Sequence, residues 1–298
     1  MMFSALKRYL RKTAPESQKS DRELILIGQA ALRLRNSINP KINDLREAEL
    51  KVFSQWGEDG ILDYICHKLS IHKPRMLEFG VGDFSECNSR FLVENRNASV
   101  VLVDSHPGLL PFVHGQDCYW KSTVIPVNDW ITRSNAQALL EKARENLEGI
   151  DIFSIDLDGN DYWILDAMNL GNIRVVVTEY NPVYGPTVSM SVPPKDDFNR
   201  NQEHSSNLYY GASLRAFIKL MSAKGFRFAG TNNAGSNAFF VGISDFDFLE
   251  IEAPNDQDLS TYCDWRVRES RDGLGNLSLM TGSSRWEAIK EMPYTHID

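Results

Sequence analysis

The chain has 298 residues, of which 42% are hydrophobic and 24% charged, and its formal net charge is −8. This composition is that of a globular protein with one large domain or two small ones, and the acidic balance argues against nucleic acid as a partner. No run reaches the roughly 18 apolar residues of a transmembrane segment. The four cysteines form no CxxC pair, which argues against a zinc site or a disulfide framework and favours a cytoplasmic protein.

The N-terminal residues 1–12 mix basic and apolar side chains without the apolar stretch of a secretory signal. They are either an interfacial helix that makes a peripheral membrane contact or a frayed, solvated start. Residues 13–21 are polar and predict a linker. Helical spacing of leucine and isoleucine then predicts an amphipathic helix over 21–38, with Asp21 near its N-cap.

Short apolar runs alternate with helical patterns through the middle of the chain, after a helix predicted over 61–69. The predicted strands are 76–81, 99–104, 123–127, 152–156 and 174–179. The predicted helices between and after them are 86–95, 107–114, 134–147 and 161–168. Strand-helix alternation of this kind predicts an α/β fold with a parallel sheet and right-handed crossovers.

The pattern changes after residue 181. Residues 182–207 are polar and too long for a simple connection, so we interpret them as a candidate active-site lid. A helix is predicted over 209–223, and strands over 226–230 and 237–243 are too close in sequence for a crossover, which predicts an antiparallel hairpin. The remaining residues show one strand-like piece, 264–269.

A glycine-rich turn follows the first predicted strand, in the sequence Glu78-Phe-Gly80-Val-Gly82. Asp104 ends the next strand, 26 residues after Glu78. Glycines let a backbone approach a nucleoside closely, and a carboxylate at the end of the second strand accepts hydrogen bonds from ribose hydroxyls. The alternatives are a tight turn without a ligand and, for Asp104, a helix cap. Phe84 stands where a further glycine is usual in such loops.

Polar residues also follow the later strands. Asp129 stands after the third strand, where it would contact adenine or belong to a plain turn. Asp156 and Asp158 end the fourth strand, and Glu179 and Asn181 end the fifth. Because the carboxyl ends of parallel strands lie at one edge of a sheet, these oxygen ligands could converge on Mg²⁺ or Mn²⁺; the alternative is that they cap helices or turns.

Two weaker candidates lie elsewhere. His204, in the candidate lid, is either a general base or a solvated loop histidine. The segment 209–213 either lines an acceptor pocket or starts a buried helix, and residues 54–59 either fold over the cofactor or cap a helix.

These motifs together resemble FkbM-type S-adenosylmethionine-dependent methyltransferases over roughly residues 50–245. The resemblance rests on segments 53–60, 77–83, 86–90, 156–161 and 179–181. It implies a Rossmann-like methyltransferase fold, a mixed seven-stranded sheet with an antiparallel terminal hairpin, as in the class I methyltransferases. It also implies S-adenosylmethionine as cofactor and O-methylation of a saccharide or natural product. A separate similarity, to catechol-type and sugar O-methyltransferases, places a metal near Asp158, Glu179 and Asn181.

We therefore predict an S-adenosylmethionine-dependent O-methyltransferase that acts on a small-molecule or saccharide hydroxyl. Residues 1–50 form a helical N-terminal extension, 51–245 the methyltransferase domain and 246–298 a C-terminal extension. The predicted cofactor-binding residues are Glu78, Gly80, Gly82, Asp104, Asp129 and Asp156. The predicted catalytic residues are Asp158, Glu179 and His204, and the predicted ligands of Mg²⁺ or Mn²⁺ are Asp158, Glu179 and Asn181.

Two other hypotheses remain open. The first is an NAD-dependent sugar oxidoreductase, which the terminal hairpin and Ser85 at the third dehydrogenase glycine both disfavour. The second is a non-catalytic binding or assembly protein on a methyltransferase fold, which the crowded carboxylates disfavour because unused buried acids are costly. The sequence carries no signal for the oligomeric state.

Overall fold

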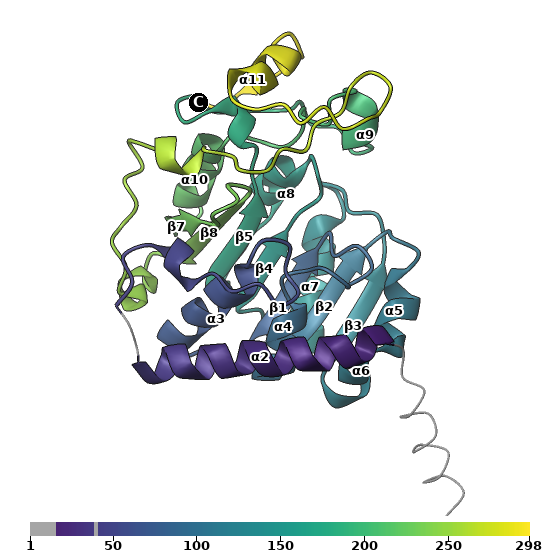
Figure 1. Cartoon of the computed structure of the whole chain (residues 1–298), viewed down its shortest axis with the longest axis vertical. Coiled ribbons are helices and arrows are strands. Elements are labelled where there is room, and N and C mark those ends of the chain that lie inside the picture. The colour runs from purple at the N-terminus through teal and green to yellow at the C-terminus, as the bar shows by residue number, and fades with distance from the viewer. Residues whose placement is uncertain (1–15, 39–40) are drawn as a thin grey trace, which may run out of the picture. The chain divides into compact units, whose positions relative to one another are not determined.

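A computed structural model describes residues 16–38 and 41–298, and it divides into two units after Pro40 (Figure 1). In the first unit, α2 spans Glu16–Ile38. The predicted helix over 21–38 is confirmed, but it begins five residues earlier, so residues 16–20 are not a linker and Asp21 is not the N-cap. The segment 16–20 has no glycine or proline to stop a helix. The predictions for residues 1–12 lie outside the described residues.

The second unit contains a mixed seven-stranded sheet in the order β3-β2-β1-β4-β5-β8-β7. The strands are β1 Arg75–Phe79, β2 Ser99–Asp104, β3 Val124–Asn128, β4 Ile152–Ile155, β5 Val175–Glu179, β7 Phe226–Thr231 and β8 Asn237–Gly242. The first five are parallel, and β8 lies antiparallel between β5 and β7. This arrangement is the predicted Rossmann-like methyltransferase fold, with its antiparallel terminal hairpin.

Helices cover both faces of the sheet because alternate strand residues point to opposite sides. The helices are η1 Leu45–Ala48, α3 Glu58–Lys68, α4 Arg90–Arg96, α5 Leu109–Gly115, α6 Asp117–Lys121, α7 Ala136–Leu147, α8 Asp161–Ala167 and α10 Leu214–Ala223. Leu77 and Phe79 of β1 belong to one core cluster, which includes residues of α7, α8 and α10. Met76 of the same strand belongs to a second cluster, which includes residues of α3, α4 and α5.

Two helices of the second unit begin four or five residues later than predicted, and one predicted strand does not form. The helix predicted over 209–223 begins only at Leu214, because Ser213 accepts a hydrogen bond from the Ala216 N–H and caps it. The helix predicted over 86–95 begins at Arg90. The strand-like piece 264–269 is not a strand. The C-terminal elements are instead η3 Phe246–Leu249, η4 Ser260–Tyr262, α11 Ser283–Ile289 and β9 Thr295–His296.

Residues 182–207, which we call the lid segment, have structure of their own. They contain η2 Pro182–Tyr184, β6 Met190–Ser191 and α9 Arg200–Glu203. β6 pairs antiparallel with β9 from the end of the chain, and Figure 1 shows α9 and α11 beyond the same end of the sheet. A small core cluster joins the lid segment to the C-terminal residues, and it includes Tyr184, Tyr209, Trp286 and Tyr294. Contacts far apart in sequence therefore hold the lid segment.

The structure tests neither predicted domain boundary, and the division at residues 50 and 245 remains a prediction. β8 ends at Gly242, and the residues beyond it add no strand to the main sheet. No helix within residues 16–38 and 41–298 combines the length and the hydrophobicity that crossing a membrane requires.

Asp59, near the start of α3, is a fully buried acid that holds the preceding turn. One of its oxygens, Oδ2, accepts hydrogen bonds from the backbone N–H groups of Val52, Phe53 and Ser54, at 2.8, 2.7 and 2.9 Å. Burial raises the pKa of Asp59 from 3.8 to about 6, although these hydrogen bonds oppose the shift. The folded protein therefore binds a proton more tightly at this site than the unfolded chain does.

We expect this carboxyl to make the folded protein less stable as the pH rises. Its contribution is fully present below about pH 4 and is lost as the pH rises through about 6. In the Asp59→Asn variant the group does not titrate, although the amide oxygen still accepts the three N–H groups. The free energy of unfolding of wild type relative to Asp59→Asn should fall by about 2 kcal/mol between pH 4 and pH 7. Urea unfolding at several pH values measures this difference, and a constant difference would contradict the expectation.

Candidate functional site

A cavity of about 600 Å³ lies at the carboxyl ends of the parallel strands. In an open α/β sheet this edge is where ligands bind. The loop after β1 forms one wall, and residues at the ends of β2, β3, β4 and β5 form the floor. The lid segment contributes Asp196, Phe198 and Arg200 to the lining, and the C-terminal extension contributes Glu269. Segments far from the strands in sequence therefore complete the lining of the cavity.

Glu78, the acidic residue of the glycine-rich turn, lines this cavity but is buried. Its two oxygens accept the backbone N–H groups of Asn88 and Ser89, each at 2.9 Å. Burial raises the pKa of Glu78 above its ordinary value, and these hydrogen bonds oppose the shift. The carboxylate therefore occupies the N-terminal end of α4, where unpaired N–H groups would otherwise attract an anion.

Gly80 and Gly82 both line the cavity and have positive φ angles, of +79° and +57°. A Cβ at Gly80 would lie 1.6 Å from the carbonyl oxygen of Asp156, so β1 and β4 can approach this closely only at a glycine. A Cβ at Gly82 would meet no atom within 4 Å. The two glycines thus do different things. The first permits close backbone packing, and the second leaves room in the cavity.

Phe84 occupies the position where such loops usually carry a further glycine, and its backbone adopts the conformation that a glycine would. Its φ is +76°, which strains a residue with a side chain. The ring is completely buried in the core cluster on the α3–α5 side of the sheet. The loop therefore keeps the usual backbone path, and burial of an aromatic ring offsets the strain.

The strained backbone at position 84 should give two variants there an unusual order of stability. Both Phe84→Ala and Phe84→Gly lose the packing of the ring, which costs about 3–5 kcal/mol. Only the glycine variant also loses the strain of the positive φ. We therefore expect Phe84→Gly to be more stable than Phe84→Ala by about 1 kcal/mol, as measured by urea unfolding. If Phe84→Ala is as stable as Phe84→Gly or more stable, the proposed backbone strain at position 84 is wrong.

Asp104 and Asp129 lie together at the ends of β2 and β3, and both line the cavity. Asp104 accepts the Gly82 N–H on Oδ2 and the His106 N–H on Oδ1, each at 2.7 Å. The backbone N–H of Asp129 donates to the Asp104 carbonyl at 3.2 Å. Asp104 therefore ties the glycine-rich turn to β2, and each of its oxygens keeps a lone pair for a ligand hydroxyl.

Three acidic residues converge at the ends of β4 and β5. Oxygens of Asp156, Asp158 and Glu179 all lie within 4.8 Å of one another, and we call these residues the acidic cluster. Burial raises the pKa of Asp156 and of Glu179 well above the ordinary values, and the neighbouring carboxylates add to both shifts. Glu179 Oε2 is buried and finds no hydrogen-bond partner among the described residues. Asp158 sits at a positive φ of +54°, and so presents its carboxylate from a turn.

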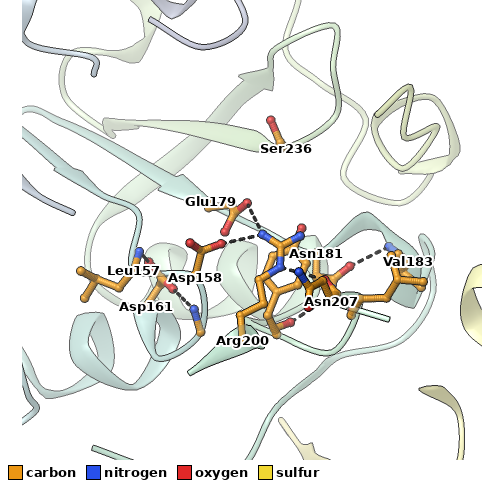
Figure 2. Close-up of polar contacts among 12 residues, drawn as sticks. Leu157, Asp158, Asp161, Glu179, Asn181, Val183, Arg200, Asn207 and Ser236 are labelled. Atoms are coloured by element: carbon orange, nitrogen blue, oxygen red, sulfur yellow. Dashed lines mark hydrogen bonds and ion pairs between the residues drawn. The ribbon is translucent and has the colours of Figure 1, made fainter. Parts of the chain in front are cut away.

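Arg200, from α9 of the lid segment, reaches into the acidic cluster, as Figure 2 shows. Its Nη1 lies 2.5 Å from Asp158 Oδ1 and 4.0 Å from Glu179 Oε1. Burial lowers the pKa of the guanidinium, but the adjacent Tyr210, Glu179 and Asp158 raise it above the ordinary value by more. Arg200 therefore stays charged.

Asn181 does not belong to this cluster, and we withdraw it from the predicted metal ligands. Its amide nitrogen donates to the carbonyls of Leu208 and Tyr210, at 2.8 and 3.0 Å, and its side-chain oxygen accepts the Val183 N–H at 3.0 Å. Asn181 is buried and caps η2. Its position after β5 places it at the carboxyl edge of the sheet, as predicted. The chain turns there, however, and the side chain makes its hydrogen bonds to the backbone of residues 183, 208 and 210. Asp156 takes its place among the converging oxygens.

His204 stands apart from the residues that line the cavity. Its Nδ1 lies 2.8 Å from the Ser206 hydroxyl and accepts the Ser206 N–H at 3.2 Å. The ring therefore shapes the turn that follows α9, and we do not retain it as a proposed general base. Asp161, the first residue of α8, accepts the N–H groups of Leu157 and Gly159 and holds the turn that carries Asp158 (Figure 2).

Sequence reasoning missed Arg200. The residue lies in a polar segment with no motif, and it acts on residues some 20 to 40 positions earlier in the chain. Gln55, from the segment considered as a cover for the cofactor, lines the cavity. Ser54 and Asp59 of that segment cap the turn, since Ser54 Oγ accepts the Asp59 N–H at 3.0 Å.

The cavity is strongly acidic. Among the described residues that line it are ten acids, namely Glu78, Asp83, Glu86, Asp104, Asp129, Asp156, Asp158, Glu179, Asp196 and Glu269. The same lining contains one basic residue, Arg200. A cavity with this balance favours a ligand with positive charge.

Comparison with known proteins gives likeness in fold alone. No protein-family model and no curated protein matches the chain. Among solved structures, fibrillarin from Aeropyrum pernix with bound S-adenosylmethionine is 14% identical, with 60% of this chain and 74% of fibrillarin covered and a TM-score of 0.37. Fibrillarin in its complex with Nop5p is also 14% identical, with coverage of 57% and 71% and a TM-score of 0.34. A candidate hemolysin from Lactococcus lactis is 16% identical, with coverage of 66% and 91% and a TM-score of 0.39.

Proposed function

We propose that this chain is an S-adenosylmethionine-dependent O-methyltransferase whose acceptor is a hydroxyl of a saccharide or a similar polar molecule. The observation that carries the proposal is the charge of the cavity at the carboxyl ends of the strands. Ten acids and one arginine line it. S-adenosylmethionine has a sulfonium and an ammonium group against one carboxylate, so its net charge is complementary to this lining.

The same observation counts against NAD. A dinucleotide places its pyrophosphate at the start of the helix after the glycine-rich turn. Here the Glu78 carboxylate already accepts the N–H groups of Asn88 and Ser89 at that place. Asp83 and Glu86, which also line the cavity, would repel two further negative charges. The described residues around the glycine-rich turn therefore offer no anion site that would support the oxidoreductase hypothesis.

The glycine-rich turn and the residues at the ends of β2 and β3 fit the adenosine part of the cofactor. Gly82 leaves open space above the turn, Asp104 has lone pairs free for ribose hydroxyls, and Asp129 lies beside it for the adenine amine. The bound cofactor supplies an electrophilic methyl group. The protein would orient it toward the acidic cluster, so the reaction depends chiefly on holding a hydroxyl in line with that methyl group.

The acidic cluster would hold the acceptor and take its proton. Glu179 Oε2 is buried and has no hydrogen-bond partner among the described residues, which makes it the proposed base. Its raised pKa brings its proton affinity closer to that of a hydroxyl than an ordinary glutamate's. Asp158 would orient the acceptor from the opposite side. We now propose Asp156 as part of this cluster rather than as a cofactor ligand.

The cluster also fits a divalent cation. Three carboxylates with oxygens within 4.8 Å of one another are a hard donor set of the kind that Mg²⁺ or Mn²⁺ prefers. We propose Asp156, Asp158 and Glu179 as the ligands. A cation there would lower the pKa of an acceptor hydroxyl bound to it.

The resemblance to FkbM-type methyltransferases supports the choice of acceptor class. Its motifs at Gly80, Gly82, Asp156, Asp158 and Glu179 all contribute to the cavity lining. Polar lining residues suit a hydroxyl-rich acceptor, namely Asn160 before α8 and Asn201 and Asn207 in the lid segment.

A transfer assay tests the proposal. The full chain is incubated with S-adenosylmethionine labelled in its methyl group and with a panel of free and nucleotide-linked saccharides. We expect label to appear in a methyl ether, to be lost by at least about 100-fold when a chelator is added, and to return with Mg²⁺. Undiminished methyl transfer in the presence of the chelator would contradict a requirement for the metal. Binding of the cofactor without transfer to any acceptor would favour the non-catalytic binding protein.

A further inference from the structure

We infer that Arg200 is the resident cation of the acidic cluster, so that a divalent cation reaches Asp156, Asp158 and Glu179 only after the lid segment releases it. The inference rests on the proposed function for the identity of the metal ligands. It adds a competition between one residue of this chain and the metal, and it couples metal binding to the position of the lid segment.

The Arg200 guanidinium uses the oxygens that the metal would need. Arg200 Nη1 lies 2.5 Å from Asp158 Oδ1 and 4.0 Å from Glu179 Oε1. Magnesium binds its oxygens at about 2.0–2.1 Å and demands a nearly ideal octahedron. An ion at that distance from the same oxygens would lie within a few ångströms of a permanent positive charge, and the two would repel each other.

Contacts on its other side also hold the Arg200 guanidinium beside the acidic cluster. Its Nε donates to the Asn207 carbonyl at 2.8 Å, and its central carbon lies 3.8 Å from the centre of the Tyr210 ring. Asp158 and Asn207, the two hydrogen-bond acceptors, have positive φ angles of +54° and +57°. Aspartate and asparagine tolerate this conformation better than other residues with a side chain. The site is therefore shaped around the side chain of Arg200.

Arg200 alone does not neutralise the negative charge of the acidic cluster. With all groups ionised, three carboxylates and one guanidinium sum to −2. Glu179 Oε2 and the Tyr210 hydroxyl are buried without a hydrogen-bond partner among the described residues, and Tyr210 is only 1% exposed. Its ring lies against the guanidinium, and burial and then the charge of Glu179 raise its pKa. A doubly charged ion would neutralise more of the cluster than Arg200 does.

Arg200 is one of several residues that fasten the lid segment to the rest of the protein. The neighbouring Phe198 packs so closely on Gly159 that a Cβ there would lie 2.1 Å from the ring. The carbonyl of Asp196 accepts a hydrogen bond from the Trp130 indole at 2.9 Å. Arg200 is the charged member of this set of contacts, so its release would loosen the segment from 195 to 207.

Calorimetric titration with Mn²⁺ tests the competition, on the full chain and on the Arg200→Gln variant. We expect Mn²⁺ to bind Arg200→Gln at least about tenfold more tightly than wild type. The matched control is Lys195→Gln, which removes another lid cation whose partner, Glu203, lies outside the acidic cluster. This control should bind Mn²⁺ with wild-type affinity.

A second measurement needs no variant. Hydrogen exchange of the wild-type chain should become faster in residues 195–207 when Mn²⁺ is added, because the ion displaces Arg200. Equal Mn²⁺ affinity in wild type and Arg200→Gln, absence of Mn²⁺ binding to the variant, or unchanged exchange in 195–207 would each overturn the inference. Titration of the same samples with S-adenosylmethionine separates this result from the proposed function, since cofactor binding does not require the metal.

Discussion

Replacing Gly80 with alanine is expected to lower the free energy of unfolding by about 3–5 kcal/mol and to abolish binding of S-adenosylmethionine. The new Cβ would lie 1.6 Å from the carbonyl oxygen of Asp156. Because both atoms belong to the backbone framework, neither can rotate away. β1 and β4 would have to separate, at the edge of the sheet where the acidic cluster begins. Urea unfolding and calorimetry measure the two effects.

The matched control is Gly82→Ala, two residues further along the same turn. Its φ of +57° costs a side chain about 1 kcal/mol, but no atom lies within 4 Å of the new Cβ. We expect a folded protein with weakened cofactor affinity, since the methyl group enters the space left for the ligand. A Gly80→Ala protein that binds the cofactor normally, or a Gly82→Ala protein equally destabilised, would contradict the assigned roles.

The Glu179→Gln substitution is expected to lower the turnover number at least about 100-fold and to leave the affinity for S-adenosylmethionine within about threefold of wild type. Glutamine keeps the shape of the side chain but cannot accept the hydroxyl proton. The cofactor contacts proposed for Gly82 and Asp104 follow β1 and β2, with β4 between them and Glu179, and are unchanged. Single-turnover transfer of the labelled methyl group measures the rate, with an acceptor that the wild-type protein methylates.

The control for this variant is Glu203→Gln, which removes an acid of α9 that pairs with Lys195 rather than with the acidic cluster. It should retain the wild-type rate. Wild-type turnover in Glu179→Gln would exclude Glu179 as the base. Equal loss in both variants would indicate that the lid segment had been disturbed instead.

The sheet could be predicted from the sequence because each buried strand is a short apolar run. Val175–Glu179, for instance, is buried on both faces between β4 and β8, and needs no polar alternation. The short gap between β7 and β8 likewise predicted their antiparallel pairing. β6 and β9 escaped prediction because each has two residues and is stabilised by a partner about a hundred positions away. The prediction of a helix start also failed where a residue outside the helix determines the first turn, as Glu78 does for α4.

In the candidate site, too, the features that depend on strand order could be predicted, and those that depend on distant contacts could not. The convergence of Asp156, Asp158 and Glu179 follows from parallel strands that end at one edge, a rule that needs only the strand order. The rule cannot say which way a side chain turns after the strand, and Asn181 turns into the lid segment. Arg200 reaches the cluster only because tertiary contacts fold the lid segment back over the sheet, and no periodicity in its own sequence encodes that.

The central claim is that the acidic cavity binds S-adenosylmethionine, and titration calorimetry of the full chain tests it most directly. Separate titrations with S-adenosylmethionine and with NAD under identical conditions compare a cationic and an anionic nucleoside ligand. We expect saturable binding of S-adenosylmethionine at one site and no binding of NAD. Asp104→Ala should weaken the binding of S-adenosylmethionine because Asp104 holds the glycine-rich turn. Binding of NAD, with no heat from S-adenosylmethionine, would contradict it.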